Sequence, residues 1–132
     1  MRILTLGGLF LLALMSACQS APTRTIDSTV PVTGAAIREV TPAEALPATS
    51  AAYSQFIDVR TPEEYAAGHA DRARNIPLDQ LGANLDVIEK NEPVYIICRT
   101  DNRSAEAARM LIDAGFKQAI VVKGGTEAWK AA

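Results

Sequence analysis

The chain has few of the residues that usually bind metals or form disulfide cross-links. Its 132 residues include one histidine and two cysteines, Cys18 and Cys98. No group of histidine, cysteine, aspartate or glutamate has the spacing of metal ligands, so we predict neither a metal site nor another cofactor. The cysteines do not form a Cys-X-X-Cys pair, which excludes the redox chemistry of that motif.

Basic residues are not in excess, which argues against a nucleic-acid-binding protein. Thirteen lysines and arginines face fifteen aspartates and glutamates, for a formal net charge of −2 at pH 7. No basic stripe is present, as a nucleic-acid-binding surface would require, so we expect no nucleic-acid partner.

The amino-terminal segment has the pattern of a secretory signal. Arg2 precedes an apolar run over residues 3–15, which is shorter than the roughly 20 residues of a transmembrane helix. Small residues follow, and residues 14–18 resemble a bacterial lipobox, which implies that Cys18 carries lipid and begins the mature protein. The alternative is ordinary signal cleavage nearby. We therefore predict a signal over residues 1–17 and a periplasmic protein anchored to a membrane by lipid.

The remaining chain divides into a tether and one domain. Residues 18–36 are rich in Thr, Ser, Pro and Ala and lack apolar periodicity, so they are predicted to be a flexible tether. Residues 37–132 are long enough for a single small domain with its own core. If Cys18 carries lipid, Cys98 is the only thiol of the mature chain, and no intramolecular disulfide can form.

Strand and helix patterns alternate through residues 37–132. Thr41 and Thr61 each have a proline next and a glutamate three positions later, which is typical of a helix start. The alternation predicts an α/β fold with a mostly parallel five-stranded sheet and helices on both faces. In such sheets, ligand sites lie beyond the carboxyl ends of the strands. We expect strands at 37–40, 56–59, 73–76, 93–98 and 119–122, and helices from 42, from 62, and at 81–88, 104–114 and 126–132.

Cys98 stands where a fully apolar strand ends and a short polar loop leads into a helix. Backbone N–H groups at a helix start, together with the nearby Arg99 and Arg103, stabilise a thiolate. The pattern predicts that Cys98 is a nucleophile. The alternative is an inert buried cysteine, against which the polar loop argues.

Several ordered motifs resemble those of one known family, the rhodaneses. Because the chain is short, exported and single-domain, it most resembles the periplasmic single-domain rhodaneses of the phage-shock type. This resemblance implies one rhodanese-like domain from residue 37 to residue 132. Residues 56–65, 68–69 and 75–78 resemble the first half of the domain, residues 98–104 its active-site loop, and residues 121–125 with Ala128-Trp129 its C-terminal signature.

The resemblance implies a sulfurtransferase. Cys98 would take sulfur from a thiosulfate-like anionic donor, become a persulfide, and pass the sulfur to a thiol or to cyanide. Arg99 would attract the donor and Arg103 would close the loop. The alternative function is a carrier or sensor of sulfane sulfur that acts with a partner protein and has little turnover. The substrate-binding residues implied by the family are Arg99, Thr100, Asp101, Asn102, Arg103 and Ser104.

The length and composition of this loop bear on specificity. Four residues separate Cys98 from Arg103. Cysteine phosphatases and arsenate reductases have one residue more, so we expect the shorter loop to exclude a tetrahedral phosphate or arsenate. Asp101 stands where many family members have glycine. We expect it to adopt the left-handed backbone conformation that aspartate tolerates, and its charge to weaken the attraction of thiosulfate.

Five other conspicuous residues have simpler structural explanations. We expect Asp58, Arg60 and Glu64 to form an ion-pair and hydrogen-bond set at a strand end, although Asp58 is also a candidate pocket residue. The single histidine, His69, is expected to be structural rather than the base for Cys98. Trp129 is expected to anchor the last helix to the core.

Overall fold

The computed structural model describes residues 35–132, in which strands and helices alternate along the chain. The predicted signal, Cys18 and most of the tether lie outside the described residues. No helix within residues 35–132 has the length and apolarity needed to cross a bilayer. The elements are β1 (Ala36–Val40), α1 (Pro42–Thr49), β2 (Gln55–Asp58), α2 (Pro62–Ala66), β3 (Arg74–Asn75), α3 (Leu78–Leu81), the 3₁₀ helix η1 (Gly82–Val87), β4 (Val94–Ile97), α4 (Asn102–Asp113), β5 (Gln118–Val122) and α5 (Gly125–Ala131).

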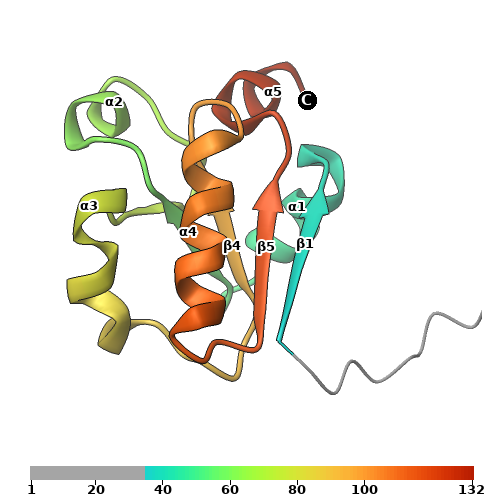
Figure 1. The fold of residues 1–132 in the computed structure, drawn as a ribbon. Helices are drawn as coiled ribbons and strands as arrows, with labels where there is room; N and C mark the ends of the chain where they lie inside the picture. Colours follow the sequence, from blue (N-terminus) through green and yellow to red (C-terminus); the bar gives the residue numbers. More distant parts are fainter. Residues whose placement is uncertain (1–34) are drawn as a thin grey trace, which may run out of the picture. The chain divides into compact units, whose positions relative to one another are not determined.

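The five strands form one sheet in the order β1-β5-β4-β2-β3, and every neighbouring pair is parallel. The predicted α/β class and five-stranded sheet are confirmed. In the register of the central pair, Asp58 at the end of β2 lies opposite Ile97 at the end of β4. The carboxyl ends of the strands therefore meet at one edge (Figure 1). Cys98 follows β4 directly at that edge.

Both faces of the sheet are buried, because alternate residues of each strand pack into different cores. Ile96 and Val121 belong to the core under α3 and α4, where Leu81, Leu111 and Phe116 are fully buried. Figure 1 shows α3 and α4 on that side of the strands. The neighbouring strand residues turn to the other core, under α1 and α5; these are Phe56, Ile97, Ile120 and Val122.

The two predicted helix starts are confirmed in their hydrogen bonds. Thr41 caps α1 and Thr61 caps α2, each accepting a hydrogen bond from a backbone N–H three residues later. The glutamate at that third position returns the bond: Glu44 accepts from Thr41 N at 2.7 Å, and Glu64 accepts from Thr61 N at 3.0 Å. Such a reciprocal pair satisfies two N–H groups that a helix start otherwise leaves free.

The expectation of a regular helix over residues 81–88 is wrong. The α-helix there is α3, which begins earlier, and Gly82 ends it; the chain continues as the irregular 3₁₀ helix η1. Glycine has a low helix propensity, and Asn84 leaves the helical conformation at φ −118° and ψ 20°. The Asn84 amide also donates to Gln80 O at 2.8 Å, a local bond of the kind that competes with a helix.

Candidate active site

Cys98 lies at the carboxyl edge of the sheet, between the end of β4 and the start of α4. Its side chain is only 1% exposed, and its thiol donates a hydrogen bond to Ser104 Oγ at 3.3 Å. Ser104 is itself fully buried in the first turn of α4, where its hydroxyl donates to Asp101 O at 3.0 Å. The sulfur is therefore held against the start of a twelve-residue helix.

The other residues of the Cys98 loop differ in their exposure to solvent, although the family resemblance implies that they bind the substrate together. Arg99, Thr100, Asp101 and Asn102 are exposed, whereas Arg103 is half-buried. The structure thus places Cys98 and Ser104 under the loop and the four exposed residues on its outside.

Arg103 forms a two-pronged ion pair with Glu64 on α2, with N–O distances of 2.6 and 2.9 Å. The expectation that Glu64 pairs with Asp58 and Arg60 is therefore wrong. The hydrogen bonds from Arg103, and then the N–H of Thr61, lower the Glu64 pKa from 4.5 to about 2. The same pair raises the Arg103 pKa. Since the Glu64 pKa is lowered, the stabilisation is complete above pH 4.5 and is lost as the pH falls through about 2.

Asp58 and Arg60 form a separate buried pair beside the site. Asp58 is fully buried and accepts from Arg60 Nε at 3.0 Å and Nη2 at 2.7 Å. Arg60 Nη2 also donates to Gly68 O at 2.8 Å, which ties the loop after α2 to the end of β2. The structure places Arg60, rather than Asp58, on the wall of the adjoining pocket.

Asp101 is not in the left-handed conformation that the sequence led us to expect. Its φ and ψ are −135° and −23°, and it occupies the N-cap position of α4. Its side chain does not cap that helix; Oδ1 instead accepts the Gly124 N–H at 2.6 Å. Asp101 therefore joins the Cys98 loop to the turn before α5.

The first residues of α5 are also hydrogen-bonded to the loop backbone. Thr126 N donates to Cys98 O at 2.7 Å, and Glu127 N donates to Arg99 O at 3.3 Å. The Arg99 and Glu127 side chains form an ion pair at 3.5 Å, but both are more than half exposed, so this pair contributes little. The start of α5 is thus a second support of the loop, which the sequence motifs did not predict.

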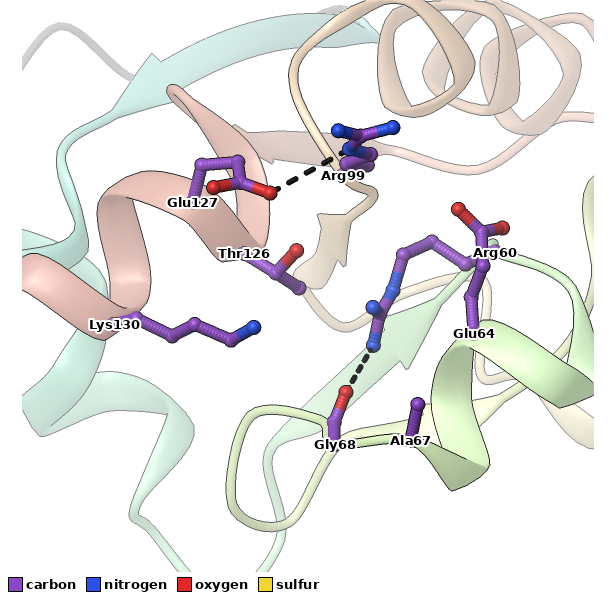
Figure 2. Close-up of a pocket in the computed structure, with 8 residues that line it drawn as sticks. All are labelled: Arg60, Glu64, Ala67, Gly68, Arg99, Thr126, Glu127 and Lys130. Carbon is purple, nitrogen blue, oxygen red and sulfur yellow. Dashed lines mark hydrogen bonds and ion pairs between the residues drawn. The ribbon is translucent and has the colours of Figure 1, made fainter.

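A pocket of about 260 Å³ lies against this loop, lined by residues from four parts of the fold (Figure 2). Two of the lining residues, Arg99 and Thr126, flank the Cys98 backbone. Only Arg99 was in the predicted set, because the others come from segments that no local pattern connects with Cys98. The lining residues are Arg60, Glu64, Ala67, Gly68, Arg99, Thr126, Glu127 and Lys130.

His69 and Trp129 have structural environments. The His69 ring stacks on Tyr65, with ring centroids 3.7 Å apart, and its Nδ1 lies 2.9 Å from Tyr65 O. Trp129 packs against Phe56 in the core under α5, at 5.3 Å between centroids. Within residues 35–132, no three His, Cys, Asp or Glu side chains are placed to hold a metal ion.

One known protein family matches the domain that contains this site. The sequence profile of the rhodanese-like domain family matches residues 41–132. The chain therefore belongs to the rhodanese-like domain family and is related to sulfurtransferases.

Individual relatives share this domain. The Bacillus subtilis protein YqhL, described as uncharacterized, is 42% identical over 76 residues; the match covers 58% of this chain and 60% of that protein. A rhodanese-like domain protein from Staphylococcus aureus has 36% identity and a TM-score of 0.63, over 70% of this chain and 90% of its own. The human single-domain sulfurtransferase TSTD1 has a TM-score of 0.65 over 70% of this chain and 95% of its own, but at 21% identity it shows the fold alone.

Proposed function

We propose that the protein is a sulfurtransferase that moves sulfane sulfur from thiosulfate or a similar anion to a thiol or cyanide acceptor. The observation that carries the proposal is the position of Cys98. Its thiol is held against the first turn of α4, where the backbone N–H groups of Asn102, Arg103 and Ser104 have no acceptor within residues 35–132. Free N–H groups at a helix start favour a negatively charged sulfur.

The chemistry consists of two displacements at sulfur. The Cys98 thiolate attacks the outer sulfur of thiosulfate, so that a new S–S bond forms as the S–S bond of the donor breaks. Sulfite leaves with the electron pair of the broken bond. Cyanide or a thiolate then attacks the outer sulfur of the persulfide, and Cys98 leaves as the thiolate. The Cys98 thiolate and the persulfide are both anions, and the helix dipole favours negative charge beside the start of α4.

The direct test is the mass of the intact protein after treatment with thiosulfate and removal of the excess. The wild type should gain one sulfur atom and lose it again on addition of cyanide, whereas Cys98→Ala should gain none. A wild-type protein whose mass does not change would contradict the proposal.

Burial of Cys98 favours a second candidate, a carrier or sensor module that holds sulfane sulfur and passes it to a partner protein. A sulfur atom held on a side chain that is 1% exposed is shielded from solvent, as a carrier that stores it for a partner requires. Both candidates form the persulfide, and repeated turnover of thiosulfate with cyanide distinguishes them. Loading without turnover would assign the carrier function.

We also propose that the protein is exported and held at a membrane through lipid on Cys18. The lipobox-like residues and the tether support this proposal, and a diacylglyceryl group supplies the two chains that stable anchoring requires. Cys18→Ala should move the protein from the membrane fraction to the soluble periplasmic fraction, as measured by fractionation and immunoblotting. A wild-type protein already found in the soluble fraction without lipid would contradict it.

A further inference from the structure

Asp101 is at the position where an aspartate normally caps its own helix. An N-cap aspartate usually accepts a hydrogen bond from the second or third N–H of the helix. Here the Asp101 carboxylate makes no such bond to α4 and accepts the Gly124 N–H, 23 positions further along the chain, at 2.6 Å. The N–H groups that a cap would occupy belong to the first turn of α4, where Ser104 accepts a hydrogen bond from the Cys98 thiol.

The contact with Gly124 is part of a continuous set of bonds between the loop and the start of α5. Thr126 N–H and Glu127 N–H bind the carbonyls of Cys98 and Arg99, so the backbone that directly follows the Cys98 side chain is fixed. Beside the exposed Arg99–Glu127 ion pair, Asp101 adds a side-chain hydrogen bond between these two segments. It is also charge-assisted, a class roughly twice as strong as a neutral hydrogen bond.

We infer that Asp101 is a positioning residue with two linked effects. By binding Gly124, it holds the loop in place over Cys98, and because its carboxylate is used there, the N–H groups of α4 stay available to the charged sulfur. This inference rests on the proposed persulfide chemistry. The expectation that the Asp101 charge weakens the attraction of an anionic donor stays a separate prediction.

Two substitutions separate the hydrogen bond from the charge. Asp101→Asn keeps a carbonyl oxygen as acceptor for the Gly124 N–H and removes the charge, whereas Asp101→Ala removes both. We expect Asp101→Asn to load sulfur on Cys98 within about twofold of the wild-type rate. We expect Asp101→Ala to load about tenfold more slowly, the scale of a hydrogen bond to a charged group. Single-turnover loading is followed by intact mass after mixing with thiosulfate.

A matched control and a spectroscopic measurement make the test specific. Asp113→Asn removes an equal charge from the other end of α4 and should leave loading unchanged. The amide proton of Gly124 should resonate downfield in the wild type and in Asp101→Asn, and shift upfield in Asp101→Ala. Equal loading by Asp101→Ala and the wild type, or equal slowing in Asp101→Asn and Asp101→Ala, would overturn the inference. Failure of the wild type to load would instead overturn the proposed function.

The charges of the pocket carry a second, independent inference about donor recognition. Three oppositely charged pairs account for every charged side chain of the pocket wall except one: Arg60 with Asp58, Arg99 with Glu127, and Glu64 with Arg103. The exception is Lys130 on α5, which has no ion-pair or hydrogen-bond partner within residues 35–132. Figure 2 shows its side chain reaching toward the space between Thr126 and Gly68.

We propose that Lys130 supplies the positive charge that recognises an anionic sulfur donor, a role that the sequence suggested for Arg99. This also rests on the proposed function. Lys130→Gln should raise KM for thiosulfate about fivefold and leave kcat at saturating thiosulfate unchanged, because an exposed charge contributes modestly to binding. Lys130→Arg, which keeps the charge, should restore KM.

Lys117→Gln is the matched control, since it removes an equal charge just before β5, at the opposite end of the sheet. Steady-state kinetics with thiosulfate and cyanide give both parameters for each variant. An equal KM in Lys130→Gln and Lys117→Gln, with the wild type active, would overturn the assignment to Lys130 while leaving the sulfurtransferase function intact.

Discussion

Cys98→Ser is expected to reduce sulfur transfer to the uncatalysed rate. A serine hydroxyl does not ionise near neutral pH, and it cannot form the persulfide on which both displacements depend. Cys98 is also the only cysteine of residues 35–132, so no neighbour within the domain can replace it. Thiosulfate:cyanide turnover, measured for both proteins at equal concentration, gives the comparison.

The fold should survive this substitution, which makes the kinetic result interpretable. Serine is slightly smaller than cysteine, and its hydroxyl can donate to Ser104 Oγ as the thiol does. Thermal unfolding should therefore change little. Ser104→Ala removes the partner and keeps the nucleophile, and its turnover should lie between those of the wild type and Cys98→Ser. Undiminished turnover in a folded Cys98→Ser protein would exclude the mechanism.

Much of the fold was predictable from the sequence because its signals are local. The apolar run before Cys98, the threonine, proline and glutamate pattern at Thr41 and Thr61, and the alternation of elements each depend on neighbouring residues. Parallel topology then places the carboxyl ends of β2 and β4 at one edge, and the position of Cys98 follows. Residues 81–88 are the exception. Their apolar residues recur with helical spacing, but Gly82 and Asn84 interrupt a regular helix.

The partners of the site residues were not predictable, because they depend on contacts between distant segments. Glu64 and Arg103 are 39 positions apart, and Asp101 and Gly124 are 23 apart. Glu64 was expected to join the Asp58–Arg60 pair, which forms without it, and Asp101 does not adopt the expected left-handed conformation. The sequence did not point to Lys130 as a binding residue, because a single lysine on a short helix matches no motif. It becomes a candidate only in the structure, where the other charged residues of the pocket wall are paired.

Gly125→Ala adds one methyl group, and we expect it to be among the most destabilising single substitutions in this domain. Gly125 has φ +57°, and a Cβ there would lie 2.3 Å from Cys98 O and 2.5 Å from both the carbonyl carbon and oxygen of Arg99. These are backbone atoms, so relief requires the loop to separate from α5. We expect a loss of about 3 kcal/mol or more, from left-handed strain and overpacking together, which lowers Tm by more than about 10 °C in a domain of this size.

Gly115→Ala distinguishes the contact with the loop from the backbone strain alone. Gly115, at the end of α4, has φ +92° and nothing within 4 Å of the position of a Cβ, so alanine there meets strain without a clash. Its unfolding temperature should fall by less than that of Gly125→Ala, and its rate of sulfur loading on Cys98 should match the wild type. Gly125→Ala should load slowly even well below its unfolding temperature, because the displaced loop no longer holds the carbonyl of Cys98 against Thr126. Equal stability and equal loading in the two alanine variants would show that close contact with α5 is not needed to position the nucleophile.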